Sequence, residues 1–172
     1  MNELHTFQSE FIENSCYRMD ESLRMINISL DKVSEEQVWL KPNIALNSIG
    51  NLILHLCGNM TLYGLSSLNV TEDKRNREVE ISIEGGLTKK QLFEKLSDTV
   101  GKVKASFQEV SLERLVTLKQ VQGFEFSGIG NIIHVVEHFS YHTGQIAFWV
   151  KQLNNKQLGF YEGHDLNTLN DD

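Results

Sequence analysis

The stretch His134-Val-Val-Glu-His138-Phe-Ser-Tyr-His142-Thr-Gly-Gln145 decides the fold that we expect of this chain. It holds three histidines at four-residue spacing inside an otherwise apolar segment. On an α-helix, positions four apart lie on one face about one turn apart, close enough for two imidazoles to share an ion. The spacing therefore predicts a metal-binding helix.

On a helical wheel the polar side chains of this segment form a single stripe, made of Tyr141, His134, Gln145, His138 and His142. Apolar side chains flank the stripe, so it should face the interior of a helix bundle rather than water. Ring nitrogens buried there need partners. A metal ion would supply them, and neutral imidazoles suit Zn²⁺, Ni²⁺ or Fe²⁺ better than Mg²⁺ or Ca²⁺.

Length and composition favour one domain spanning residues 1–172. A chain of 172 residues is large enough for a single core but short of two. Proline occurs once, at Pro42, and period-two alternation of β-branched residues is scarce. Both features favour helices as the main element. The expected fold class is therefore an all-α bundle.

Charge and cysteine content exclude several classes of function. A net charge of −7 and an isoelectric point near 5.4 would repel a phosphate backbone, so nucleic-acid binding is not expected. The chain has neither a basic leader before an apolar run nor an apolar stretch long enough for a bilayer, which predicts a soluble protein without membrane contact. Cys16 and Cys57 are too few for a disulfide framework and fit a reducing cytoplasm, although a single bridge between them stays open.

Apolar residues spaced three or four apart predict four long helices, over about residues 2–31, 48–68, 88–107 and 128–153. Asn47 or Ser48 can cap the second of them. Two further stretches match capping boxes, Ser34-Glu-Glu-Gln37 before a short turn and Thr88-Lys-Lys-Gln91 before the third long helix.

The connections between these helices are also informative. Residues 69–87 form a polar connection long enough to carry the chain from one end of a bundle to the other, which would make the second and third long helices parallel neighbours. Residues 116–127 alternate and suggest an extended strand or a small hairpin. The tail after residue 155 is polar apart from Leu158-Gly-Phe-Tyr161, part of which is expected to pack.

The three-residue ligand set that we expect draws on two helices. An HxxxH pair occurs by chance, so His138 and His142 alone would be a weak signal. His55 strengthens it, because it lies on a mixed polar stripe of the second helix and would complete a three-histidine site with open positions, as catalytic zinc sites have. His134 lies a full turn further along, so an outer-shell or substrate-facing role is favoured for it, while direct ligation and plain packing stay open.

Five side chains are candidates for a catalytic or orienting role: His134, Glu137, Tyr141, Gln145 and Asn59. Metal-bound imidazoles usually donate their other N–H to an outer group, which the neutral members of this set could accept. Glu137, or Glu125 in the preceding loop, could act as general base for metal-bound water. A solvated surface charge is the plainer interpretation of both glutamates.

These residues resemble the DinB-like superfamily of metal-binding four-helix bundles. The resemblance rests on Ser48-Ile-Gly-Asn-Leu-Ile-Leu-His55-Leu on an early helix and on His134-x-x-x-His138-x-x-x-His142-x-Gly-Gln145-Ile on the last. Trp39-Leu-Lys-Pro42 is similar to the superfamily's lead-in to its second helix. The similarity runs from about Met1 to Leu153 and is strongest to a branch with the signature His-Phe-Ser-Tyr-His-Thr-Gly-Gln.

The resemblance implies that His55, His138 and His142 bind a divalent cation, zinc or nickel, with water in the remaining positions. It also implies an up-down-down-up bundle and a homodimer. Relatives include low-molecular-weight-thiol S-transferases and a mycothiol-dependent maleylpyruvate isomerase, which implies a small thiol as the partner. The homodimer has weak support from an apolar far side of the last helix, made of Ile129, Ile133, Val136 and Phe148.

Three functions are therefore to be compared. The first is a metal-dependent transferase that activates a small thiol at the three-histidine site. The second is a metal-dependent hydrolase, which needs a carboxylate near the ion to activate bound water. The third is a non-enzymatic bundle whose ion holds the helices together.

Overall fold

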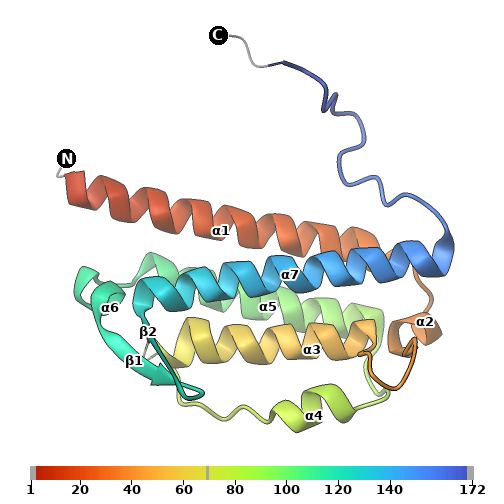
Figure 1. Cartoon of the computed structure of the whole chain (residues 1–172), viewed down its shortest axis with the longest axis horizontal. Coiled ribbons are helices and arrows are strands. Elements are labelled where there is room, and N and C mark those ends of the chain that lie inside the picture. The colour runs from red at the N-terminus through yellow and green to blue at the C-terminus, as the bar shows by residue number, and fades with distance from the viewer. Residues whose placement is uncertain (1–2, 69, 170–172) are drawn as a thin grey trace.

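Four long helices form the structure, a computed structural model that describes residues 3–68 and 70–169 (Figure 1). They are α1 (Glu3–Leu30), α3 (Ile49–Met60), α5 (Lys89–Gln108) and α7 (Gly128–Asn154). The shorter elements are α2 (Glu35–Trp39), the π-helix η1 (Thr61–Ser66), α4 (Arg77–Ser82), α6 (Leu112–Val116), β1 (Leu118–Val121) and β2 (Phe124–Ser127). The predicted all-α class is confirmed, and the alternating stretch is an antiparallel hairpin of β1 and β2.

The long helices follow an up-down-down-up order. In Figure 1, α1 and α7 run in one direction while α3 and α5 run in the other. The segment from residue 70 to 87, with α4 inside it, leads from the end of η1 back along α3 to the start of α5 (Figure 1). This return path makes α3 and α5 parallel neighbours, as the length of the connection predicted. Residues 2 and 69, at the edges of the expected elements, lie outside the described residues.

Side-chain caps fix where the helices begin. The Ser34, Ser48 and Thr88 hydroxyls each accept a hydrogen bond from the backbone N–H three residues on, and the side chain there accepts one in return. These are the reciprocal contacts of a capping box. At its C-terminal end, α7 stops after Asn154, one residue beyond the expected Leu153. The next residue, Asn155, has a left-handed φ of 50°, which ends the helix.

Two elements differ from the sequence expectations. The second long helix does not stay α-helical to Leu68, because η1 replaces its last turns. The 69–87 connection is not wholly irregular, since it contains α4, capped by Asn76. With six residues and no fully buried side chain, α4 has no hydrophobic periodicity that could reveal it. It is held by tertiary contacts instead.

The core fills the space between the long helices. α1 packs on α7 and α5, and α3 packs on α5 and α7. The largest buried side chains come from all four helices and include Met19, Ile26, Ile53, Leu56, Leu96, Phe107, Phe139 and Ile146. The two cysteines are free and buried, and burial raises the pKa of the Cys57 thiol to about 11, so this side chain is a packing group. No helix in the described part is long and apolar enough to cross a bilayer.

We expect Gly64→Ala to destabilise the fold, because a Cβ at Gly64 in η1 would lie 2.6 Å from Cγ1 of Val103. Overpacking of this kind typically lowers the free energy of unfolding by about 1–3 kcal/mol. Gly101 of α5 is the matched control, since a Cβ there would meet no described atom within 4 Å. Gly101→Ala should raise stability by about 0.5–1 kcal/mol. Urea unfolding measures both, and equal effects would contradict the close approach of η1 and α5.

Candidate metal centre

Three histidines from α3 and α7 meet where these helices pack. His55 projects from α3 toward His138 and His142, which lie one turn apart on α7. One ring nitrogen of each lies within 4.8 Å of those of the other two. Nε2 of His55 is 3.0 Å from Nε2 of His138, and the His55 ring centroid is 5.1 Å from each of the other two. The structure thus brings together the three residues that the sequence singles out.

The donor set fits a divalent transition metal. Two nitrogens bound to a tetrahedral ion at 2.0–2.1 Å lie about 3.4 Å apart, close to the separation of the His55 and His138 nitrogens. Burial, together with the neighbouring histidines, lowers the pKa of His138 to about 3. Burial also lowers the pKa of His142. Both rings are therefore neutral near pH 7, which is the form that binds metal. The cluster could hold a metal ion.

Gln145 orients one of the rings. Its Oε1 lies 2.7 Å from Nδ1 of His142, so it accepts the Nδ1–H and leaves Nε2 with its lone pair available. Tyr141 contacts the same ring edge-on, with centroids 5.0 Å apart, but most of its side chain is exposed. Of these two candidates, Gln145 therefore has the clearer orienting contact.

His134 lies beside the cluster rather than in it. Its ring stacks on that of His138 with centroids 5.2 Å apart, and Asn59 Nδ2 lies 3.1 Å from its Nε2. Tyr63 of η1 covers the ring, with centroids 4.0 Å apart. Burial lowers the pKa of His134, so it too is neutral near pH 7. Asn59 is buried and its Oδ1 has no partner among the described residues, which leaves one polar atom unsatisfied next to the cluster.

The sequence analysis missed an ion pair behind His55. Glu80 of α4 places Oε2 3.3 Å from Nδ1 of His55. Arg75 binds both oxygens of that carboxylate, each at 2.8 Å. Burial alone would raise the pKa of Glu80, but the hydrogen bonds from Arg75 and His55 outweigh it and leave the pKa below its ordinary value. Both residues stand in a polar stretch that gives no sign of this contact.

The two glutamates considered as general bases lie elsewhere. Glu137 is exposed and lines cavities between α7 and α1. Glu125 is exposed in β2, where Gln120 Nε2 donates to it at 3.0 Å. Among the acids of the described residues, Glu80 is the one within ion-pair distance of a cluster histidine. Neither proposed base therefore contacts the cluster.

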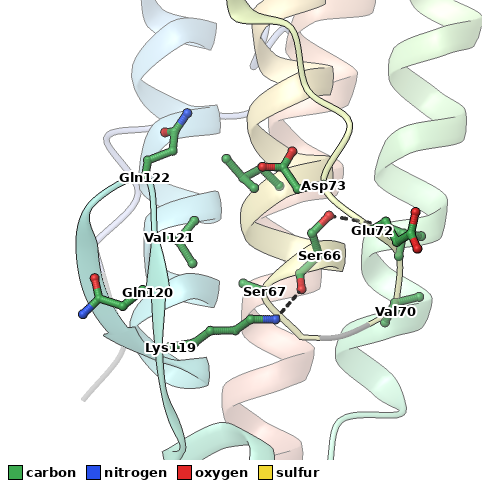
Figure 2. Close-up of a pocket in the computed structure, with 11 residues that line it drawn as sticks. Ser66, Ser67, Val70, Glu72, Asp73, Lys119, Gln120, Val121 and Gln122 are labelled. Carbon is green, nitrogen blue, oxygen red and sulfur yellow. Dashed lines mark hydrogen bonds between the residues drawn. The ribbon is translucent and has the colours of Figure 1, made fainter.

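A cavity of about 490 Å³ lies beside η1, between the first residues of the 70–87 segment and β1 (Figure 2). Its walls are mixed and include Glu72, Asp73, Gln120 and Gln122, and Lys119 donates to the backbone oxygen of Ser66 at 2.8 Å. The Tyr63 hydroxyl donates to Gln122 Oε1 at 3.1 Å. Tyr63 therefore links this cavity to His134.

Comparison with known proteins identifies the family. Residues 6–161 match the family described as "Protein of unknown function (DUF1572)". A crystal structure of a DinB-like protein from Bacillus cereus aligns with a TM-score of 0.66 at 14% identity, covering 83% of this chain and 90% of that one. A DinB-like protein from Bacillus subtilis aligns with a TM-score of 0.57 at 16% identity, covering 88% of this chain and 96% of that one. No curated protein matches the chain.

At these identities the solved structures establish a shared fold and nothing finer. The family match, over residues 6–161, reaches all four long helices and includes every residue of the histidine cluster. The chain belongs to the DUF1572 family, and its fold is that of the DinB-like proteins.

Proposed function

We propose that this protein binds zinc or nickel through His55, His138 and His142 and acts as a transferase that activates a small thiol there. The observation that carries the proposal is the convergence of three imidazoles, with no carboxylate in the ligand cluster that the described residues form. Burial keeps two of the rings, His138 and His142, neutral. A neutral three-nitrogen set leaves a divalent cation with positive charge and open positions. A cation in that state would lower the pKa of a thiol and hold the thiolate.

The protein's own groups would orient the reaction. Gln145 and Glu80 hold the Nδ1 atoms of His142 and His55, which directs both Nε2 atoms inward. His134 and Asn59 would offer polar groups beside a sulfur bound at the cluster. In the transfer, the thiol loses its proton to solvent, and its sulfur bonds to an electrophilic carbon as the leaving group departs.

A hydrolase is supported less well. The hydrolase expected from the sequence uses a nearby carboxylate as general base for metal-bound water, and such a base must lie within hydrogen-bond reach. Glu137 and Glu125 do not contact the cluster, and the Glu80 carboxylate is held by Arg75 and His55. A thiol ionises more readily than water on binding a cation, because its ordinary pKa of about 8.5 is already far below that of water.

The proposal includes a homodimer formed through α1 and α7. An apolar cavity lies between these helices, lined by Phe7, Phe11, Ile133 and Val136 among others. Phe7 is 65% exposed, Ile133 51% and Phe148 63%. Large apolar side chains gathered on one face are typical of an interaction surface. A second copy would remove them from water.

Untagged protein should bind one equivalent of Zn²⁺ in competition with a chromophoric chelator. His55→Ala, His138→Ala and His142→Ala should each weaken binding by more than the roughly 10–100-fold typical of an outer partner, because each removes a ligand. His134→Ala should lose less, and the exposed His5→Ala should match the wild type. A loss in His134→Ala as large as in His138→Ala would place His134 in the ligand set.

Glutathione and cysteine serve as probe thiols for the reaction class. We expect calorimetry to detect binding of at least one of them to zinc-loaded protein, with proton release, because the thiol ionises on binding. Binding should vanish in His138→Ala. No thiol binding, together with a large fall in melting temperature on metal removal, would favour a metal-stabilised bundle without catalysis.

Ile133→Lys should convert the dimer to a monomer in sedimentation velocity, because it places a charge in the apolar α1–α7 face. Lys102→Glu, on the exposed part of α5, is a control for a change of charge alone. A wild-type chain that sediments as a monomer at every concentration contradicts this part of the proposal.

A further inference from the structure

One face of α3 is shaped to receive α4. Asn51, His55 and Gly58 follow at helical spacing of four and three residues, so they share this face. Fully buried Asn51 donates from Nδ2 to the backbone oxygens of Glu80 and Ile83, at 3.1 and 2.7 Å. These two bonds hold α4 in register over His55.

Gly58 completes this receiving face by its lack of a side chain. A Cβ at this position would overlap the Glu80 carboxylate and lie 2.9 Å from Nε of Arg75. The ion pair therefore rests directly against the α3 backbone, and the carboxylate reaches His55 over a single turn of the helix. Any larger residue at position 58 would push the carboxylate away from that ring.

The ion pair between Arg75 and Glu80 is buried, and burying charged groups costs free energy. Only 6% of the Arg75 side chain and 11% of the Glu80 side chain are exposed. A buried ion pair gives up hydration that its mutual attraction often fails to recover, so its presence is weak grounds for a role in stability alone. The hydrogen bond to His55 is the feature of this pair that a surface ion pair could not supply.

We propose that Glu80 is a positioning residue of the metal centre, held by Arg75 so that its carboxylate accepts the Nδ1–H of His55. The inference rests on the proposed function, because it concerns a ligand of the same ion. Accepting this proton fixes His55 in the tautomer whose Nε2 lone pair faces His138 and His142.

The position of Arg75 shows why a carboxylate is needed beside His55. Its Nη2 lies 3.1 Å from Nδ1 of His55, so the guanidinium stands next to the same ring atom. A guanidinium can only donate, so Arg75 alone would favour the tautomer in which Nδ1 accepts and Nε2 carries the proton, and its charge opposes a cation on the ring. Glu80 therefore does two things at once: it accepts the ring proton and neutralises the charge beside the ligand.

The experiment measures the zinc affinity of Glu80→Gln against Glu78→Gln, an exposed matched control on the same helix. We expect a loss of about 10–100-fold for Glu80→Gln, the range typical of an outer partner, and no change for Glu78→Gln. In a His55→Ala background, Glu80→Gln should have no further effect, because its partner is gone. An equal loss with and without His55 would overturn the proposal.

A second readout needs no metal. Long-range ¹H–¹⁵N spectra of the metal-free protein should show His55 protonated at Nδ1 in the wild type and shifted toward the Nε2 tautomer in Glu80→Gln. An unchanged tautomer would overturn the positioning role. If the wild type binds no zinc while its tautomer depends on Glu80, the proposed function fails and the orienting contact stands.

A third variant, Gly58→Ala, displaces the carboxylate but keeps its charge. It should reproduce the loss of zinc affinity and the tautomer shift of Glu80→Gln, with circular dichroism to confirm that the helices persist. Wild-type affinity in folded Gly58→Ala would contradict the requirement for this receiving face.

Discussion

The contact between Nε2 of His55 and Nε2 of His138, 3.0 Å apart inside an apolar bundle, is the constraint on which the rest of the structure depends. Two ring nitrogens cannot face each other there unless they share a proton or an ion. Burial keeps the His138 ring neutral, Glu80 contacts Nδ1 of His55, and Gln145 contacts Nδ1 of the neighbouring His142. Folding of the bundle therefore brings together ring nitrogens whose lone pairs are free to bind an ion.

The path of the chain follows from the same requirement. α3 and α7 run antiparallel and place their histidines side by side, while the 70–87 segment returns along α3 (Figure 1). This return makes α3 and α5 parallel, and it also delivers Glu80 to the outer side of His55. A connection that looks like a spacer in the sequence is therefore part of the centre.

Much of this arrangement could be predicted from local patterns. The apolar spacing of the long helices and the reciprocal Ser48 and Thr88 caps depend on residues within one or two turns, and the structure confirms them. The polar stripe of α7 and the isolated His55 of α3 correctly pointed to one shared interior. The ligand role of these histidines stays a prediction.

The parts that could not be predicted depend on distant partners. Glu80 and Arg75 stand among other charged residues, and only Asn51 and Gly58 on another helix give them a buried position. In the sequence, Tyr63 looks like an ordinary core residue. In the structure, its position in η1 packs its ring against that of His134. Spacing within one helix carries no information about such contacts.

The central claim is that these three imidazoles bind one ion, and X-ray absorption at the metal edge of the zinc-loaded protein tests it most directly. The account predicts one shell of nitrogen and oxygen ligands at about 2.0–2.1 Å, with the outer-ring scattering of three imidazoles and no sulfur. A shell near 2.3 Å from cysteine sulfur, or fewer than three imidazoles, would contradict it.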